Sequence, residues 1–321
     1  MIETSLLKKI GCIIIAITTN FIMFSSCLVG DLSIVFMAMF LCIPTYSAIM
    51  LIYPNFLYSV FPILTTVGVY IVTDNILITL LFVMFLLLAA LCTEGVSRKR
   101  TKFDTIVRMS VVMFFASIFM FVVAVFITQG YFSREAILDF SNELLNEYNK
   151  TIELIGKDTE IYTVLLEEFS KTIPATFFTL FVVLSYFSCT FTRKIVYWFN
   201  CENRIFNFDN YWEFEMPIET AYIFIVSYAF LFFTPYINAE IPALDVVLYI
   251  IIYPLMFGMF LSGIKQVNEW LRHQHFGKGL IVFLIIIGAL IFFNLVFSVA
   301  AFIGVYRCFN INKSKKWTVE K

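Results

Sequence analysis

Ionisable side chains avoid the middle of the long apolar segments of this chain. Such a group inside a membrane span usually marks an ion path or a proton relay, because burying it there costs at least about 2.5 kcal/mol. The nearest candidates are Arg108, Glu219 and Asp245, and each lies close to one end of its apolar segment. Side chains at these positions can extend to the polar interface. We therefore expect interfacial anchoring and no proton-coupled pump with a central carboxylate.

Uncharged polar residues inside the apolar segments are candidates to line a cavity. They are Thr18, Asn20, Thr65, Thr66 and Asn294. Such groups also form interhelical hydrogen bonds, worth about 0.6 kcal/mol each. We favour hydrogen bonding between helices over a binding cavity for this set.

Two prolines inside apolar segments indicate where a substrate site could be built. Pro44 and Pro62 interrupt the second and third segments, and broken helices can form a binding site near the midplane of a membrane. Most prolines in membrane helices only kink a helix or begin one. Pro44 and Pro62 are thus candidate cavity positions, with a packing role as the alternative.

No metal site or enzymatic centre is predicted. His273 and His275 form an HxH pair in a basic loop, and two histidines without an acidic or thiol partner nearby are a poor metal set. The seven cysteines contain no CxxC pair and mostly fall inside apolar runs. The chain also has no GxxxxGK[ST], GxSxG or HExxH motif. We expect no enzyme activity, no cofactor and no nucleic-acid partner.

The composition is that of a polytopic membrane protein. Of 321 residues, 61% are hydrophobic and 14% are charged, whereas soluble proteins carry about 25% charged residues. A helical span needs about 20 apolar residues. The apolar segments of suitable length are 10–29, 32–53, 56–73, 76–94, 105–128, 174–198, 217–237, 243–264 and 279–305. We predict an all-α transmembrane helical bundle of about eight to nine spans, forming a single membrane domain over residues 1–321.

The first four segments are joined by short turns. The turns lie at Gly30-Asp31, Pro54-Asn55 and Asp74-Asn75. Gly, Pro, Asn and Asp are the residues that interrupt helices and form turns. Consecutive segments should therefore be antiparallel neighbours.

A polar insert at 131–173 separates the N-terminal spans (1–130) from the C-terminal spans and tail (174–321). Its acidic side chains outnumber its basic ones by nine to four. Apolar residues recur at steps of three and four over 137–152 and 161–169, which predicts two amphipathic helices. The break between them is expected at Gly156-Lys157-Asp158. We expect the insert to form a folded cap on the outer face, acting as a lid, as a docking surface, or as two packed helices with neither role.

Basic loops predict which side of the membrane each loop faces. The basic residues are Arg98, Lys99, Arg100 and Lys102 after span four, Arg193, Lys194 and Arg204 after span six, and Lys265, Arg272 and Lys278 after span eight. These loops should face the cytoplasm and suit anionic lipid headgroups, so the insert at 131–173 faces outside. Nine crossings would leave the basic tail, with Arg307 and Lys313, outside as well. Either one segment does not cross, or the tail is an exception to the tendency.

The segment from Tyr211 to Pro217, with the sequence YWEFEMP, resembles a motif of the YybS-like family of bacterial membrane proteins of unknown function. The family motif is F-x-E-W-x-x-P and leads into a span. Tyr211 stands for its Phe, Glu213 for its Glu, Phe214 for its Trp and Pro217 for its Pro. The resemblance implies a multi-pass protein of the bacterial plasma membrane.

Other parts of the chain are similar to the same family. The run from Ile43-Pro44 to Arg100 resembles its front half, Pro174 resembles the proline that opens the span after its outer loop, and Gly263 to Lys278 resembles its stretch from a glycine to a basic loop. The membrane core of the family is similar to the substrate-binding S components of energy-coupling-factor vitamin transporters. This likeness is one of fold and does not itself carry function.

Two functions are open at this point. The first is a non-enzymatic transport-type protein that binds a small solute or a lipid-like molecule among kinked helices. The second is an interaction protein of the cell envelope, whose acidic insert and basic loops recruit a membrane protein partner. Both place the chain in a lipid bilayer, and neither identifies the ligand.

Overall fold

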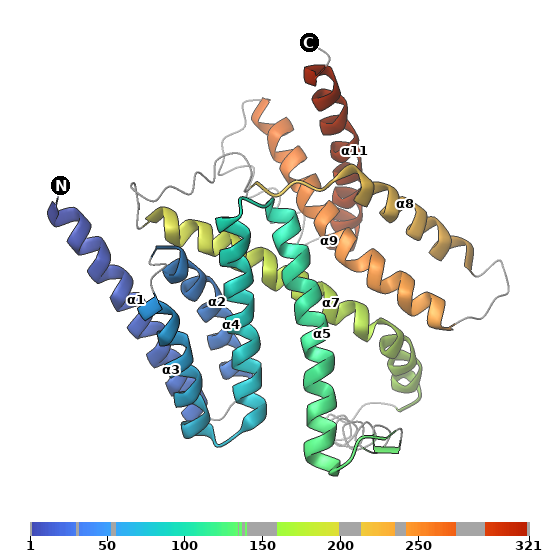
Figure 1. The fold of residues 1–321 in the computed structure, drawn as a ribbon. Coiled ribbons are helices and arrows are strands. Elements are labelled where there is room, and N and C mark those ends of the chain that lie inside the picture. Colours follow the sequence, from blue (N-terminus) through green and yellow to red (C-terminus); the bar gives the residue numbers. More distant parts are fainter. Residues whose placement is uncertain are drawn as a thin grey trace. The chain divides into compact units, whose positions relative to one another are not determined.

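The computed structural model describes residues 2–29, 32–52, 56–133, 135–136, 139, 159–198, 213–234, 242–273 and 293–319. Within these ranges the regular secondary structure is helical and no strand occurs (Figure 1). The helices are α1 (Ile2–Val29), α2 (Leu32–Ile52), α3 (Phe56–Thr73), α4 (Ile76–Ser97), α5 (Lys102–Gln129), α7 (Thr159–Trp198), α8 (Ile218–Phe233), α9 (Pro242–His273) and α11 (Phe293–Val319). Each expected apolar segment overlaps one of them, so the predicted all-α membrane bundle is confirmed.

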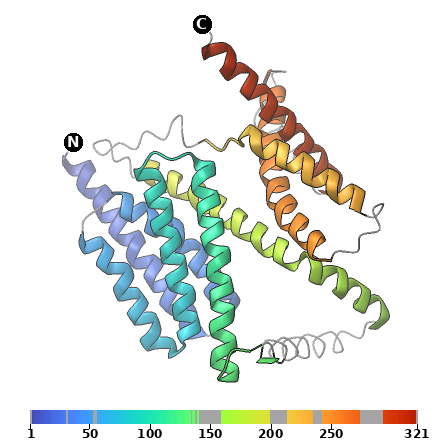
Figure 2. The same ribbon diagram turned by 45° about the vertical axis from the view of Figure 1, so that its right-hand side comes forward.

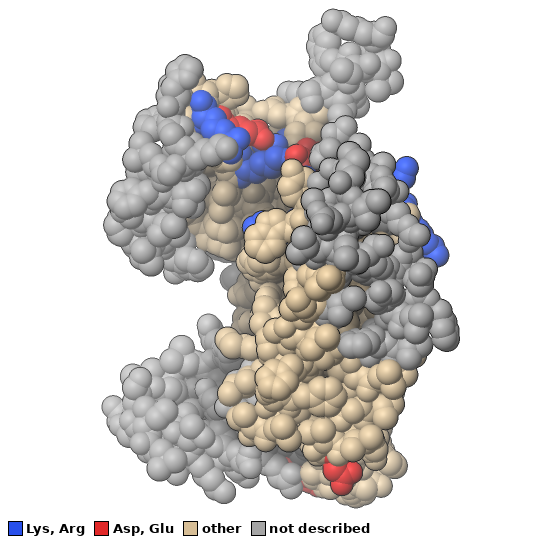
Figure 3. Space-filling model, turned by 90° about the vertical axis from the view of Figure 1, so that its left-hand side faces the viewer, with Lys and Arg blue, Asp and Glu red and all other residues tan. Residues whose placement is uncertain are grey.

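Four of the described helices contain stretches with the length and composition of membrane spans. By length and composition, four are able to cross a bilayer: Ile76–Ser97, Lys102–Gln129, Thr172–Trp198 and Leu244–His273. Shorter apolar helical stretches accompany them at Ile17–Val29, Phe40–Ile52, Ile63–Thr73, Ile218–Phe233 and Val296–Ile311. Figure 3 shows a wide uncharged area of the described surface, with Lys and Arg side chains in the upper part of the view. Large apolar side chains cover such surface where a bilayer replaces water as the solvent.

The chain divides into two compact units. Unit 1 comprises Met1–Val164 and Leu184–Trp212, and unit 2 comprises Leu165–Val183 and Glu213–Lys321. Each unit has its own buried side chains and its own polar contacts, so the two are described separately.

Unit 1 contains α1 to α5, which lie side by side in both ribbon views (Figure 1, Figure 2). The predicted turn at Asp74-Asn75 is present: α3 ends at Thr73, and the Asn75 side chain caps α4 by accepting from two backbone N–H groups at 2.9 and 3.3 Å. At the far end of α5, Gly130 adopts a left-handed φ of 75° and its N–H donates to the carbonyl of Phe126. The turns predicted at Gly30-Asp31 and Pro54-Asn55 lie outside the described residues.

Unit 2 is held together by the contact of α9 with α11. A Cβ atom built on Gly263 would lie 1.8 Å from the carbonyl oxygen of Ala300, and one on Gly304 would lie 1.9 Å from that of Met259. The two backbones therefore touch, which only glycine permits. The Phe260 and Phe297 rings stack beside this contact, with centroids 4.5 Å apart. Helix α8 packs against both partners.

Helix α7 runs across the predicted boundary between insert and span. The sequence places that boundary at 173–174, where Pro174 is expected to open a span, and the candidate membrane span within α7 is Thr172–Trp198. The helix itself does not begin there, since α7 is a single helix of 40 residues with Pro174 inside it. A proline in a helix interior removes one backbone hydrogen bond and usually bends the helix without ending it, so the second predicted amphipathic stretch, 161–169, continues directly into the span.

The rest of the predicted insert cannot be compared in the same way. Most of the first amphipathic stretch, 137–152, and the break at Gly156-Lys157-Asp158 lie outside the described residues. The described chain resumes at Thr159, directly after the predicted break. The position and packing of the cap stay predictions.

Candidate functional site at the α4–α5 turn

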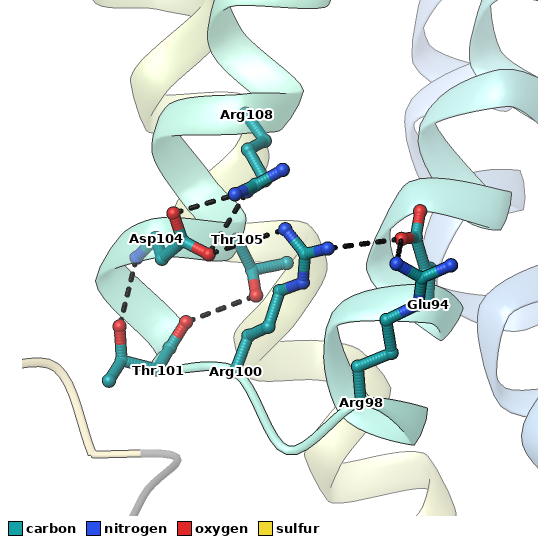
Figure 4. Close-up of polar contacts among 7 residues, drawn as sticks. All are labelled: Glu94, Arg98, Arg100, Thr101, Asp104, Thr105 and Arg108. Atoms are coloured by element: carbon teal, nitrogen blue, oxygen red, sulfur yellow. Dashed lines mark hydrogen bonds and ion pairs between the residues drawn. The ribbon is translucent and has the colours of Figure 1, made fainter.

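The turn between α4 and α5 gathers charged side chains into one network (Figure 4). On α4, Arg98 Nη1 lies 3.1 Å from Glu94 Oε1. Arg100 lies between two carboxylates, 3.3 Å from Glu94 Oε1 and 3.6 Å from Asp104 Oδ2. On α5, Arg108 Nε donates to both carboxylate oxygens of Asp104, at 3.1 and 3.0 Å. These five residues are called the α4–α5 charge cluster below.

Local hydrogen bonds satisfy backbone groups at the end of α4 and at the start of α5. The N–H groups of Lys99 and Arg100 donate to carbonyls in the last turn of α4, at 3.1 and 2.9 Å. The Thr101 hydroxyl caps α5 by accepting from the N–H of Asp104 at 3.1 Å. Lys99 has a φ of 53°, the left-handed conformation that glycine usually provides after a helix. The turn thus presents a lysine at its tip at some cost in backbone strain.

Positive charge exceeds negative charge at this turn. Lys99 and Lys102 bring its basic side chains to five, against two carboxylates. The Arg98 and Arg108 side chains are 65% and 55% exposed, whereas that of Arg100 is 20% exposed. Exposed ion pairs contribute only about 0–1 kcal/mol. An anionic ligand can therefore replace a carboxylate at Arg98 or Arg108 at little cost.

An apolar surface runs along α5 from this charged end. Val111, Phe115 and Ile118 follow Arg108 at steps of three and four residues, which places them on one side of the helix. All three are exposed, Phe115 to 65%. The combination of an exposed guanidinium and an exposed apolar stripe matches a molecule with an anionic head and an apolar tail.

Lys102 lies apart from the exposed cluster and points into unit 1. The sequence placed it in a basic loop facing lipid headgroups, yet it is only 5% exposed. Its ammonium donates to Thr190 Oγ1 at 2.7 Å and lies 4.4 Å from the centre of the Tyr186 ring. Lys102 therefore ties the start of α5 to α7. Tyr186 and Thr190 occur one turn apart on α7, a spacing that could have suggested a common partner.

A second charged network lies in unit 2. Lys265 on α9 pairs with Glu213 and lies 3.9 Å from Glu215, just before α8. One turn further along α9, Glu269 accepts two hydrogen bonds from Arg307 on α11. Arg307 also donates to Gln266 at 2.9 Å and is 7% exposed. The sequence assigned Arg307 to a basic tail, whereas the structure buries it as one half of an ion pair.

The motif residues that the structure describes lie next to this second network. Glu213 contacts Lys265, Phe214 lies beside Gly258 on α9, and Pro217 precedes the first residue of α8. Gly263 is the glycine at which α9 touches α11. Tyr211 lies outside the described residues. The segment that resembles a family motif therefore docks the start of α8 on α9.

Pro44 belongs to unit 1 and lies inside α2, where it is buried. In the same unit, Thr65 of α3 donates to Asn20 Oδ1 of α1 at 2.9 Å, and Tyr46 of α2 donates to the same oxygen. These polar side chains join three helices, in agreement with the favoured role of interhelical hydrogen bonds. Pro62 lies within α3, but its side chain is outside the described set, as is that of Asn294.

Helix directions bring basic segments together within each unit. In unit 1, the Lys102–Thr190 contact places the end of α4 beside the end of α7, where Arg193 and Lys194 follow. In unit 2, α9 and α11 run in the same general direction in both ribbon views (Figure 1, Figure 2), and the Glu269–Arg307 pair lies C-terminal to the Gly263–Ala300 contact on both helices. These two helices are therefore parallel, and their C-terminal ends lie on the same side.

The part of the chain that the structure describes contains no group of three or more His, Cys, Asp or Glu side chains arranged to hold a metal ion. His273, which ends α9, is exposed, and His275 lies outside that part. The interpretation of the HxH pair as a poor metal set stays a prediction.

Comparison with known protein families places the chain. A family model described as "Predicted membrane protein (DUF2232)" matches residues 16–306. No curated protein and no solved structure matches the chain. The matched region includes part or all of every described helix in both units.

Proposed function

Because the chain belongs to the DUF2232 family of predicted membrane proteins, we propose that it is a non-enzymatic protein of the bacterial plasma membrane that binds an anionic, lipid-like molecule. The binding position is the α4–α5 charge cluster together with the exposed side of α5. This choice develops the transport-type hypothesis and gives it a location.

One observation carries the proposal: Arg108 is exposed at the head of an exposed apolar stripe. A phosphate or carboxylate head would take the place of Asp104 at the Arg108 guanidinium, because charge-assisted hydrogen bonds to guanidinium are strong and directional. The tail would lie along Val111 and Phe115. Lys99, at the tip of the turn, adds a second positive charge for the same head, in the manner of basic sites that bind anionic lipids.

The resemblance to the YybS-like family, and through it to S components, motivates a transport-type role for the bound molecule. In that view the protein presents its ligand to another membrane component. A fold-level likeness does not itself carry function. The proposal therefore rests on the residues of the α4–α5 turn.

We also propose that the basic ends of the helices face the cytoplasm and that 131–173 lies outside. Parallel α9 and α11 then place the tail, including Lys313, inside as well, in agreement with the positive-inside tendency. Arg307 adds nothing to this charge bias, since Glu269 neutralises it.

Thiol labelling on intact cells tests the orientation. Single cysteines would be placed at Ser97, Tyr131 and Asn310 in a chain whose seven native cysteines are replaced. An impermeant reagent should label the Tyr131 variant and spare the other two until the cells are opened. Labelling at Asn310 on intact cells would contradict the position of the tail.

Lipid retention tests the binding site. The full chain would be purified from membranes rich in phosphatidylglycerol, and bound lipid quantified by mass spectrometry. Arg108→Gln combined with Lys99→Gln should reduce retained phosphatidylglycerol about tenfold, the effect of losing roughly 1.4 kcal/mol of binding free energy. Arg272→Gln, an exposed charge in unit 2, is the matched control and should leave retention unchanged.

Two results would count against this function. Equal loss of lipid from the control and the double variant would mean general charge attraction without a site. Purification with a stable protein partner and no retained anionic lipid would favour the second hypothesis, an envelope interaction protein.

A further inference from the structure

Three sulfur atoms from three helices meet inside unit 1. Cys92 lies on α4, Met109 on α5 and Cys189 on α7, and each is fully buried. The Cys92 and Cys189 sulfurs are 3.9 Å apart. The sulfurs of Cys189 and Met109 are 3.7 Å apart. Two thiols and one thioether thus lie together, on helices that the surrounding contacts hold close.

The surrounding contacts fix the three helices on either side of the sulfur atoms. Lys102 joins α5 to α7 at Thr190, the neighbour of Cys189. Ser110 and Ser185 approach within 3.4 Å one turn further in. Helices α4 and α5 also pack closely at Gly95, where a Cβ would lie 2.4 Å from the Oγ1 atom of the Thr105 side chain. The sulfur atoms therefore sit in a packed junction.

The two sulfur distances at Cys189 are compatible with a shared metal ion. A metal held by sulfur at about 2.3 Å in a trigonal plane requires sulfur atoms about 4.0 Å apart, and the Cys92–Cys189 and Cys189–Met109 distances are close to this value. Thiolate and thioether ligands select soft ions such as Cu(I). Structural zinc sites almost always use four ligands, and this junction offers three sulfurs.

We propose that Cys92, Cys189 and Met109 form a binding site for one Cu(I) ion. The ion would bind through the two thiolates and the thioether. This inference is independent of lipid binding at the α4–α5 turn. It also goes beyond the cysteine pattern in the sequence, because Cys92 and Cys189 are far apart in the chain and a methionine is the third ligand.

The binding reaction balances without any oxidant or reductant. Two thiols and Cu(I) give one Cu(I) bis-thiolate and two released protons, and the thioether binds without losing a proton. The bound group then carries one negative charge. The ammonium of Lys102, which donates to Thr190 next to Cys189 in α7, is the nearby cation that would offset this charge.

Hydroxyl groups border the sulfur atoms. Thr192 Oγ1 lies 3.8 Å from the Cys92 sulfur. Ser188, one turn before Thr192 on the same side of α7, is buried, and its hydroxyl has no hydrogen-bond partner. Such a donor can serve a thiolate that metal binding creates, as outer hydrogen bonds commonly do around metal ligands.

Unit 2 supplies a matched control. Cys308 and Met259 are also buried, with their sulfurs 3.8 Å apart. This contact has one thiol and one thioether, and the residues described around it add no second thiol. It reproduces the sulfur contact without the bis-thiolate, so it should not bind Cu(I) with comparable affinity.

The test is an anaerobic titration of the purified full chain in lipid nanodiscs with Cu(I), in competition with a chromogenic Cu(I) chelator. The expected result is one chelator-resistant Cu(I) per chain and two protons released per ion. Cys92→Ser and Cys189→Ser should each weaken binding at least a hundredfold, and Met109→Leu about tenfold. Cys308→Ser should leave the stoichiometry and affinity unchanged.

X-ray absorption on the unaltered Cu(I)-loaded chain keeps the test decisive if a variant fails to fold. It should show three sulfur neighbours and no nitrogen or oxygen. Full binding in Cys92→Ser, nitrogen ligation, absence of chelator-resistant Cu(I), or isolation of Cys92 and Cys189 as a disulfide that reductant does not open would each overturn the proposal.

Discussion

The α4–α5 turn and the α9–α11 pair use the same residue types to different ends. At the turn, the Arg108 and Asp104 side chains form an ion pair, and both are exposed. Between α9 and α11, Arg307 is almost completely buried and is bonded to Glu269 and Gln266. An exposed pair can exchange a partner for a ligand, whereas a buried arginine cannot lose its partner without a large penalty. The exposed pair at the turn is therefore suited to binding a ligand, and the buried pair is suited to holding α9 and α11 together.

The backbone contact in unit 2 should give the largest effect of substitution. Gly263→Ala places a methyl group against a backbone carbonyl, which cannot move aside as a side chain can. We expect a loss of about 3 kcal/mol in the free energy of unfolding, measured by denaturant titration in micelles. Gly95→Ala is the matched change in unit 1, where the methyl meets the Thr105 side chain, and should cost about 1 kcal/mol. Equal losses in the free energy of unfolding for Gly263→Ala and Gly95→Ala would contradict this difference between a backbone contact and a side-chain contact.

Removing the buried cation should give the next largest effect. Arg307→Ala leaves Glu269 without its two hydrogen bonds, and we expect a loss of about 2–3 kcal/mol, below the range for fully buried pairs because Glu269 is 43% exposed. Glu94→Ala at the exposed turn should cost less than about 1 kcal/mol. Thermal unfolding of both variants, followed by circular dichroism, gives the comparison. A larger loss for Glu94→Ala would reverse the assigned roles.

The smallest effect should be a gain in stability at the exposed turn. Lys99→Gly relieves the left-handed strain of a residue with a Cβ atom, offset in part by the greater freedom of glycine in the unfolded chain. We expect a gain of about 0.5 kcal/mol, together with weaker retention of phosphatidylglycerol. A gain in stability without any loss of lipid would leave Lys99 without a part in binding.

Most of the fold could be predicted from the sequence because spans are encoded locally. An apolar run of the right length predicts a helix, and Asp74-Asn75 predicts the turn that the structure contains. A helix start at Pro174 is absent, because a single proline bends a helix more readily than it ends one. In each case the signal or the error lies within a few neighbouring residues.

The partners of the charged residues could not be predicted in this way. In a membrane, both the packed side and the lipid side of a helix are apolar, so periodicity does not report which side faces a neighbour. Lys102 and Arg307 lie near the ends of apolar segments, and the sequence therefore predicts that both belong to exposed basic segments. Their burial depends on Tyr186, Thr190 and Glu269, which only the packing of helices brings near.

The contact of Gly263 with α11 also bears on how the protein is made. Helix α11 is the last described helix of the chain, so α9 is synthesised well before the partner that covers its bare glycine surface and neutralises Glu269. Before α11 has been synthesised, Glu269 lacks its arginine partner, and no helix covers the surface of α9 at Gly263. A chain released before residue 293 would present both to the quality-control proteases of the membrane, while unit 1 would have received all of its helices.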